Sequence, residues 1–508
     1  MECPLVNQIF RQLFATPARG CLRLGQHQHA QHTFRRTLRE QRRHYALRKT
    51  DADGQGGSSW QQRLDHFPRD VSKQLREYPR VTARELKHRS QRPMRVKMAT
   101  REFIDDSLYN PNYGYFPKNA TIFNLPEPFD FNGTKDGAEF QRMVDKSYLE
   151  FEDDLDAIQQ DDLRQLWHTP TELFRPYYGE AIARWLVTNY KNSLFPYHDL
   201  IIYEIGAGNG TLMCNILDHI RETDIEVYHR TKFRIIEISA SLAEMQNTSL
   251  RHSPYFADHL EHIQIINKSV FDWDTLIPEP NFFLALEVID NFAHDTLRYD
   301  PYTERPLQGG VLVDETGALF EHYEPNLDDL VARFLRIRRA ASRHQPPRTP
   351  VSNRYYPPWL RKLRHELPFA PNLTIPEYIP TRLLQFFDIL SSYFPHHRLL
   401  LSDFTQLPTA VPGLQAPIVQ TRYKRQNVTV TTPFVHQGYF DIFFPTDFEL
   451  MEDIYRAVTG KLTRVVSHGN FLGSWADIEA TTFRSGENPL LGTGYGGWYG
   501  NVGVMTTA

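Results

Sequence analysis

The sequence predicts a doubly wound, Rossmann-like α/β fold, and two observations lead to this prediction. Short apolar runs at 200–205, 233–239 and 281–289 are typical of strands that are buried in a parallel sheet. The first run leads through a glycine-rich turn into 212–220, where apolar residues recur at helical spacing. Strand, turn and helix in this order indicate an α/β sheet with helices on both faces.

The length and composition argue against several function classes. A chain of 508 residues is long enough for two or three domains, or for one large domain with insertions. The formal net charge of −4 argues against binding of DNA through bulk charge, so we expect no DNA partner. Cys3, Cys21 and Cys214 form no CxxC pair, so we expect no metal site. No apolar run approaches about 18 residues, so we expect no transmembrane segment.

Residues 1–45 are typical of a mitochondrial transit peptide. They contain eight arginines, no lysine and two acids, and apolar residues recur at helical spacing between Leu5 and Phe14. The membrane potential draws such positive charge inward, and an amphipathic helix presents one apolar face to a receptor. The expected location is therefore the mitochondrial matrix; the alternative is a disordered basic tail. Residues 46–98 are polar and carry charges of both signs, which indicates a flexible polar arm.

The remaining range, 99–508, is predicted to form one domain with two insertions. The first is expected near 117–165, where the acid-rich residues 145–162 indicate a surface helix. The second is expected near 325–375, where proline and arginine are abundant; the alternatives there are a lid over a substrate and a loop without structure. The C-terminal residues 494–508 are predicted to form a last strand at an edge of the sheet.

The most informative segment follows the first predicted strand. Gly206, Gly208 and Gly210 occupy alternate positions, and Glu204 precedes the first of them by two residues. Glycines let the backbone turn tightly and let a ligand approach the main chain. The spacing G-x-G-x-G differs from the G-x-G-x-x-G of dinucleotide sites and is similar to the first motif of S-adenosylmethionine methyltransferases. That cofactor carries an ammonium group and an uncharged ribose, so a neighbouring carboxylate is tolerated. The alternative is an ordinary tight turn between a strand and a helix.

Acidic residues follow the next two predicted strands. Glu237 lies at the end of 233–239, where it is placed to accept both hydroxyl groups of a ribose; the alternative is a surface glutamate. Asp272 follows a third strand within 262–274 and is assigned to the adenine amino group, although Asp274 is also available. The predicted cofactor site consists of these two acids, Glu204 and the three glycines.

Glu287 and Asp290 lie at the end of a fourth predicted strand, within 281–292. Ligands of open α/β sheets bind at the carboxyl ends of the strands, so these acids are expected to face the methyl group or the substrate. Two carboxylates can bind a guanidinium group through charge-assisted hydrogen bonds and accept its proton during methyl transfer. We therefore predict that both residues are catalytic; the alternative is that they cap a helix or form ion pairs.

Together, these segments resemble the MidA-like family of mitochondrial methyltransferases. The similar stretches are the glycine loop, 108–116 with Gly114-Tyr115-Phe116, 169–186 with Tyr178-Gly179-Glu180, Glu237-Ile238-Ser239, Leu286–Asn291, Asp403-Phe404-Thr405, and 438–451 with Asp441, Asp447 and Phe448. The resemblance covers roughly residues 100–505. The chain departs from the family pattern at GAGNG, where the family has Gly-Pro-Gly-Arg-Gly, at Leu286, where it has asparagine, and at Asp403-Phe404-Thr405, where it has Asp-Tyr-Gly.

The resemblance implies S-adenosyl-L-methionine as the cofactor. It also implies a protein arginine N-methyltransferase that acts in the assembly or stability of respiratory complex I, with a complex I subunit as the expected substrate. Some departures lie on the substrate side, so a second hypothesis is a weakly active or inactive assembly factor for a respiratory complex or the mitochondrial ribosome. A third hypothesis, a nicotinamide-linked oxidoreductase, is disfavoured by the glycine spacing.

Overall fold

The computed structural model describes residues 70–507 apart from 160, 163, 253–257, 343–348, 352–371 and 495–496. The predicted transit peptide, residues 1–45, therefore lies outside the described residues, as does the first part of the predicted polar arm.

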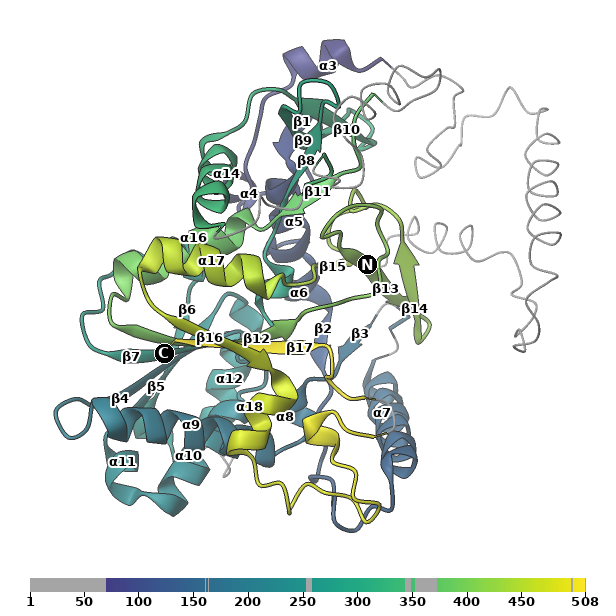
Figure 1. Ribbon diagram of the computed structural model, residues 1–508. Coiled ribbons are helices and arrows are strands. Elements are labelled where there is room, and N and C mark those ends of the chain that lie inside the picture. Colours follow the sequence, from purple (N-terminus) through teal and green to yellow (C-terminus); the bar gives the residue numbers. More distant parts are fainter. Residues whose placement is uncertain are drawn as a thin grey trace, which may run out of the picture.

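The central feature is a mixed sheet with the strand order β16-β17-β12-β7-β4-β5-β6 (Figure 1). Its strands are β4 (Leu200–Ile205), β5 (Thr231–Glu237), β6 (Ile263–Asn267), β7 (Asn281–Leu286), β12 (His397–Phe404), β16 (Thr463–Ser467) and β17 (Val502–Thr507). The strands from β12 to β6 are parallel, and β17 is antiparallel to both of its neighbours. The predicted doubly wound α/β class is confirmed. The last strand was predicted at an edge but lies inside the sheet, because β16 adds a further strand beyond it.

Helices cover both faces of this sheet. Ile202 of β4 belongs to the core that contains α9 (Tyr177–Ser193) and α10 (Thr211–Thr223). Its neighbour Tyr203 belongs to the core that contains α16 (Thr381–Tyr393) and α17 (Phe448–Thr459). Successive side chains of a strand point to opposite faces, which explains the division. In Figure 1, α16 and α17 lie above the sheet, and α9 and α10 lie below it.

The order of strand addition reverses at β4. The chain places β5 and β6 on one side of β4, and then places β7 and β12 on the other side. Such a switch point leaves a crevice at the carboxyl ends of the two central strands, and ligands of doubly wound folds bind there. The glycine-rich turn follows β4 and Glu287 follows β7, so both segments lie at this crevice.

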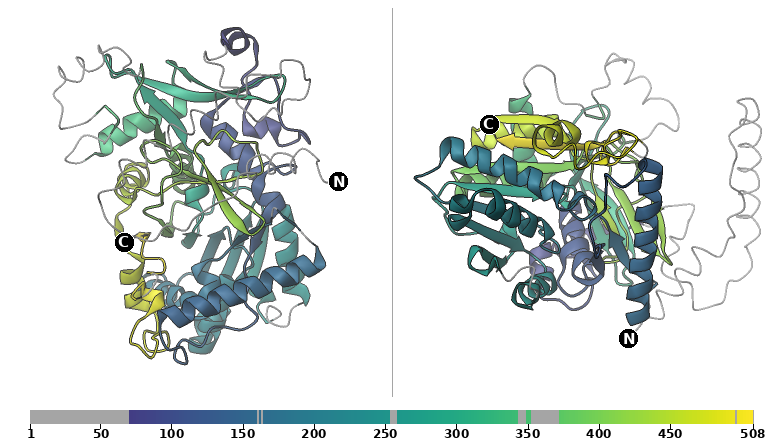
Figure 2. Two further views of the ribbon diagram at one scale, coloured as in Figure 1. Left: turned by 90° about the vertical axis from the view of Figure 1, so that its right-hand side faces the viewer. Right: turned by 90° about the horizontal axis from the view of Figure 1, so that it is seen from below.

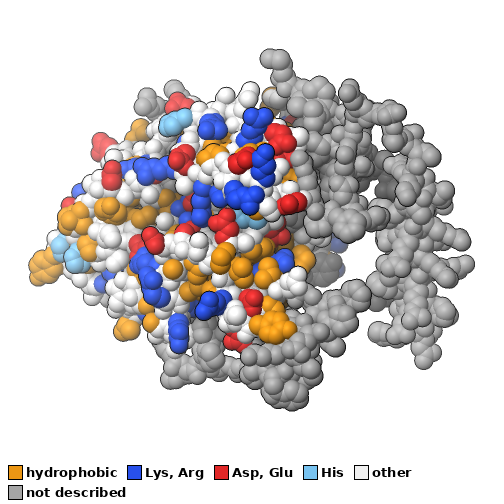
Figure 3. All heavy atoms as spheres, turned by 90° about the horizontal axis from the view of Figure 1, so that it is seen from above, with side chains coloured by type: hydrophobic (Ala, Val, Ile, Leu, Met, Phe, Trp, Pro, Cys, Tyr) orange, Lys and Arg blue, Asp and Glu red, His pale blue; other side chains and the backbone are white. Residues whose placement is uncertain are grey.

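A second, antiparallel sheet lies at the upper end of the molecule in Figure 1. It consists of β1 (Val96–Ala99), β8 (Asp295–Tyr299), β9 (Pro306–Val313), β10 (Leu319–Glu324) and β11 (Glu377–Ile379). Seen from above, this end carries acidic and basic side chains that are interspersed (Figure 3). This view therefore shows no extended surface of a single charge sign.

Part of the predicted polar arm belongs to the folded unit. Residues 70–98 contain α3 (Ser72–Glu77), α4 (Ala83–Leu86) and the start of β1, in which Val96 pairs with Val313 of β9. Leu86 is 0% exposed and contributes to a small core beside the antiparallel sheet. The apolar residues here are few and widely spaced, which explains why the composition of 46–98 indicates an arm.

The first predicted insertion carries the long helix α7 (Gly137–Ile158), which runs along the outside of the molecule (Figure 2). One face of α7 is solvated, but Phe140 and Glu152 are buried on the other face, and Glu152 forms an ion pair with Arg422. This insertion also contains most of the short parallel pair formed by β2 (Ala120–Ile122) and β3 (Gln165–Trp167).

The remaining elements complete the covering layers. They are α5 (Thr100–Tyr109), α6 (Tyr115–Asn119), α8 (Pro170–Leu173), α11 (Ile225–His229), α12 (Ala240–His252), α14 (Asp329–Ala341), α18 (His468–Trp475), and a small sheet of β13 (Ile418–Tyr423), β14 (Gln426–Val430) and β15 (Asp441–Phe443). Short 3-10 helices span Leu260–His262, Val270–Asp272, Ile289–Asn291 and Pro489–Leu491. Within the described residues, no helix is both long and apolar enough to cross a membrane.

Candidate active site

The turn after β4 requires glycine at its alternate positions. Gly206, Gly208 and Gly210 have φ angles of +70°, +54° and +81°, in the left-handed region that side chains disfavour. Space is also short: a Cβ atom on Gly206 would lie 2.7 Å from Cγ2 of Val288, and one on Gly208 would lie 2.6 Å from Cδ1 of Ile122. The loop is therefore covered from two sides, by the segment after β7 and by β2.

Two carboxyl groups lie buried beside this loop. Glu204 is 4% exposed, and its Oε2 atom has no hydrogen-bond partner. Burial, together with the charge of Glu237, raises the pKa of Glu204 to about 8. Glu237 ends the neighbouring strand; burial raises its pKa to about 6, although the backbone N–H of Ser239 donates to its Oε1 atom at 2.8 Å. A cationic ligand with hydroxyl groups would match this pair, because it would supply both positive charge and donors.

A third carboxyl group on the loop was not predicted as a site residue. Glu172, in α8, accepts hydrogen bonds at Oε1 from Nδ2 of Asn209 at 3.0 Å and from Oγ1 of Thr211 at 2.8 Å. Its Oε2 atom is buried without a partner, and burial raises its pKa. The segment 169–186, which contains Glu172, was matched to the family pattern, but the sequence did not indicate that Glu172 contacts the glycine loop. The fold shows this contact, because it places α8 against the loop.

Asp272 is placed differently from the other predicted cofactor residues. Its Oδ2 atom forms an ion pair with Nζ of Lys87 at 2.7 Å, and its side chain is 34% exposed. The alternative residue, Asp274, is paired with Lys268, also at 2.7 Å. An adenine amino group would therefore have to share the Asp272 carboxylate with Lys87. The assignment of Asp272 to adenine stays a prediction.

The segment 287–291, which we call the acid loop, is held in an unusual conformation. Glu287 has a φ angle of +51°, which is costly for a residue with a side chain and is typical of functional sites. Asp403 stabilises the loop, because its Oδ2 atom accepts the backbone N–H groups of Ile289 at 3.0 Å and Asp290 at 3.1 Å. Asp441 accepts Nδ2 of Asn291 at 3.1 Å. Asp403 and Asp441 were noted in the family resemblance but were not predicted as site residues.

The acid loop brings two carboxyl groups together where water is excluded. Burial raises the pKa of Asp290 to about 7, and burial together with Asp290 raises the pKa of Glu287 well above its usual range. Oε1 of Glu287 and Oδ1 of Asp290 are buried and have no hydrogen-bond partner. The structure thus brings the two predicted catalytic acids together. Among the described residues, neither acid forms an ion pair with a lysine or arginine, so a cationic group bound at this loop would complement both of them.

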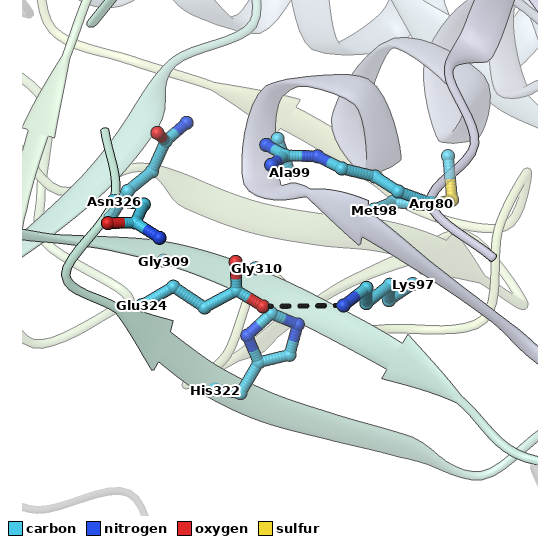
Figure 4. A pocket seen from close by; sticks show the side chains of 10 residues that line it. Arg80, Lys97, Met98, Ala99, Gly309, Gly310, His322, Glu324 and Asn326 are labelled. Atoms are coloured by element: carbon cyan, nitrogen blue, oxygen red, sulfur yellow. Dashed lines mark ion pairs between the residues drawn. The ribbon is translucent and has the colours of Figure 1, made fainter. Parts of the chain in front are cut away.

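A separate hollow lies on the antiparallel sheet, away from the crevice (Figure 4). Two ion pairs lie along it, since Lys97 is 3.7 Å from Glu324 and Arg80 is 3.7 Å from Asp328, whereas both ring nitrogens of His322 are buried without a hydrogen-bond partner. It is formed by β1, β9 and β10 rather than by the carboxyl ends of the parallel strands. We therefore exclude it from the candidate active site.

Comparison with known proteins relates this geometry to a family. Residues 181–466 match the family described as "Putative S-adenosyl-L-methionine-dependent methyltransferase". Two curated relatives carry the name "Protein arginine methyltransferase NDUFAF7 homolog, mitochondrial". The Schizosaccharomyces pombe protein is 26% identical over 76% of this chain and 81% of its own length. The Saccharomyces cerevisiae protein is 21% identical over 62% of this chain and 74% of its own length.

Solved structures are also similar. A Burkholderia thailandensis protein crystallised with S-adenosyl-homocysteine is 13% identical, with a TM-score of 0.47 over 81% of this chain and 88% of that chain. A second crystal structure from the same organism is 14% identical, with a TM-score of 0.47 over 81% of this chain and 87% of that chain.

The family match covers more than half of the chain and includes the glycine loop, Glu237 and the acid loop. The predicted enzyme class and the predicted cofactor, S-adenosyl-L-methionine, are confirmed by it. The chain belongs to this family of S-adenosyl-L-methionine-dependent methyltransferases.

Proposed function

We propose that this methyltransferase transfers the methyl group to an arginine side chain of a protein, and that Glu287 and Asp290 bind the arginine. One observation carries the proposal: each of these buried acids keeps one carboxyl oxygen without a hydrogen-bond partner. A guanidinium group presents five donors in a fixed fork and cannot lose its charge in a protein. It therefore supplies both the hydrogen bonds and the positive charge that the acid loop lacks.

The cofactor end of the crevice is assigned to other residues. We propose that Gly206, Gly208 and Gly210 let the cofactor approach the backbone, that Glu204 meets its ammonium group and that Glu237 accepts its ribose hydroxyls. When bound, S-adenosyl-L-methionine supplies an electrophilic methyl group. Glu204 and Glu237 have no lysine or arginine partner among the described residues, and such a pair fits a ligand that carries positive charge.

The acid loop then has two tasks. First, Glu287 and Asp290 orient the guanidinium so that one nitrogen faces the methyl group, and such positioning lowers the entropic part of the barrier. Second, they take up a proton: the new nitrogen–carbon bond forms as the sulfur–carbon bond breaks, and the nitrogen releases its hydrogen as a proton. A carboxyl group with a pKa of about 7, as for Asp290, suits a general base at neutral pH.

We further propose a mitochondrial location and a protein substrate. Residues 1–45 have the composition of a transit peptide, and both curated relatives are named mitochondrial. The relatives' names support arginine as the acceptor. The resemblance to the MidA-like family supports a substrate among the complex I subunits and a location in the matrix.

The proposal is tested by removing the negative charge of each acid without changing its shape. Methyl transfer from labelled cofactor to mitochondrial protein is measured for the wild type, Glu287→Gln and Asp290→Asn, with the exposed Glu449→Gln as a control. We expect each site variant to lose at least about 100-fold in rate, the usual contribution of a general base, while the control keeps its activity. Binding of S-adenosyl-homocysteine is measured in parallel to show that the crevice is intact.

Unchanged transfer in both site variants would contradict the assigned roles. A wild-type protein that binds the cofactor but methylates no protein would favour the second hypothesis, an inactive assembly factor on the same fold.

A further inference from the structure

Three aromatic side chains form a continuous row beside the crevice, which we call the aromatic row. It consists of Trp167 at the end of β3, Phe116 in α6 and Tyr109 at the end of α5. The Phe116 ring centroid is 5.3 Å from that of Trp167, in an edge-on arrangement, and 5.4 Å from that of Tyr109, with the planes 16° apart. All three side chains are half-buried.

One end of the row lies next to the glycine loop. Trp167 is the register partner of Ile122 in the β2–β3 pair, and the backbone N–H of Phe123 donates to its carbonyl oxygen at 2.7 Å. Ile122 is the residue whose Cδ1 atom covers Gly208. The Trp167 end of the row is therefore fixed to the element that covers the proposed cofactor position.

The other end of the row reaches the acid loop. The Tyr109 hydroxyl donates to the backbone carbonyl of Asn291 at 3.2 Å. Burial, and then the charges of Asp105, Asp290 and Asp441, raise the pKa of Tyr109 well above its usual range. The row thus spans the distance between the two halves of the proposed active site, and its Tyr109 end lies near the carboxyl groups of Asp290 and Asp441.

The inner side of the row is supported by packing. Tyr115 is 1% exposed, and its ring contacts that of Phe116 at 5.4 Å and that of Trp167 at 5.7 Å. The three rings of the row are therefore held by a core on one side, while part of their surface is left accessible. Accessible aromatic faces beside buried carboxylates attract cations, and a planar guanidinium also stacks on such rings. A compact, strongly hydrated ammonium group gains less from the same surface.

We propose that the aromatic row lines the path of the acceptor side chain and makes the site selective for arginine over lysine. The proposal rests on the proposed function, because it assumes that the acceptor is a cationic side chain that reaches Glu287 and Asp290.

The test compares binding of two neutral-capped tripeptides, acetyl-Gly-Arg-Gly-amide and acetyl-Gly-Lys-Gly-amide, to the full chain saturated with S-adenosyl-homocysteine. Binding is followed by ligand-detected NMR for the wild type, Phe116→Leu and Trp167→Leu. Phe129→Leu is the matched control, because Phe129 makes a comparable edge-on ring contact with Phe140, at 5.1 Å, in a different core. Thermal unfolding of each variant checks that it is folded.

We expect the wild type to bind the arginine peptide more tightly than the lysine peptide. Loss of the ring in Phe116→Leu should lower the affinity for the arginine peptide by roughly 3- to 30-fold, the range that cation–π contacts provide. The affinity for the lysine peptide should change little. Affinity for S-adenosyl-homocysteine should change by less than about twofold, since the rings do not enter the glycine loop. Trp167→Leu should act in the same direction, and it replaces Phe116→Leu if that variant does not fold.

The inference would be overturned if the wild type bound neither peptide or bound both equally well. It would also be overturned if Phe116→Leu and Trp167→Leu kept the wild-type preference for the arginine peptide. Methyl transfer to the arginine peptide is measured separately. If the wild type binds this peptide through Phe116 but does not methylate it, the proposed function fails, and the row remains a guanidinium-binding surface.

Discussion

The Cγ2 atom of Val288 lies 2.7 Å from the position that a Cβ atom on Gly206 would occupy. The acid loop after β7 therefore packs directly on the glycine loop after β4, and each loop limits the shape of the other. This contact joins the two halves of the candidate site, which the chain order separates by about 80 residues.

The first prediction concerns Gly206→Ala. Alanine would have to adopt a φ angle of +70° and would also collide with Val288, so the glycine loop must shift. We expect the dissociation constant for S-adenosyl-homocysteine, measured by calorimetry, to rise at least about tenfold, which corresponds to 1.4 kcal/mol.

Gly317→Ala is the matched control, because Gly317 has a φ angle of +82° but no atom within 4 Å of its Cβ position. It should lose about 1–2 kcal/mol of stability and no cofactor affinity. Equal affinity losses in the two variants would contradict the packing argument.

The second prediction concerns the pH dependence of cofactor binding. The pKa of Glu204 is raised to about 8 in the protein without ligand, so the group holds a proton at pH 6. A ligand ammonium group favours the carboxylate, and binding must therefore release that proton. We expect affinity for S-adenosyl-homocysteine to increase as the pH rises from about 6 to about 7.5, because less free energy is then needed to remove the proton from Glu204. Calorimetry in two buffers of different ionisation enthalpy measures the released proton.

In Glu204→Gln the affinity for S-adenosyl-homocysteine should depend less steeply on pH, because the glutamine has no proton to release. An identical slope in wild type and variant would assign the pH dependence to another group.

The third prediction concerns stability. The pKa of Glu204 in the folded chain, about 8, is above its ordinary value of 4.5. The folded state therefore binds a proton that the unfolded state has lost, and the stabilisation from this group is complete only below about pH 4.5 and is lost as the pH rises to about 8. Glutamine does not ionise, so the stability of Glu204→Gln relative to the wild type should grow between pH 5 and pH 8. Urea unfolding at both pH values measures the free energy of unfolding of each protein. A difference between Glu204→Gln and the wild type that does not change with pH would contradict the raised pKa of Glu204.

The fourth prediction tests whether residues 70–98 belong to the folded unit. Leu86 is 0% exposed, and Leu86→Ala should lose about 2–5 kcal/mol of the free energy of unfolding, the usual cost of emptying a core position. Met94, which is 51% exposed, provides the control substitution Met94→Ala, which should cost less than about 0.5 kcal/mol. Denaturant unfolding measures both. A cost for Leu86→Ala as small as that for Met94→Ala would indicate that the antiparallel sheet does not depend on α4.

The glycine loop and the positions of the acids beside it were predictable from the sequence because their signals are local. The β-branched run before Gly206, the alternate glycines and the helical spacing after them lie within 200–220, and strand-end acids such as Glu204 and Glu237 follow from the rule for parallel sheets. The acid pair Glu287 and Asp290 was found by the same rule. Their roles remain proposals, since position in a sheet does not by itself define chemistry.

The rest depends on contacts between distant parts of the chain. Glu172, Asp403 and Asp441 reach the two loops from three separate elements, and no local pattern distinguishes them from surface acids. The pairing of β1 with β9 joins residues more than 200 positions apart, so the composition of 46–98 could not reveal it. The ion pair between Asp272 and Lys87 is another such contact, and it gives Asp272 a partner that a strand-end rule does not anticipate.

Identification of the methylated residue tests whether this chain methylates arginine. Mitochondrial protein is incubated with the enzyme and with cofactor labelled in its methyl group, and the acid hydrolysate is analysed by mass spectrometry. We expect the label to appear in Nω-methylated arginine and to be absent with Glu287→Gln. Label in methyl-lysine, or label that does not depend on Glu287, would contradict this expectation.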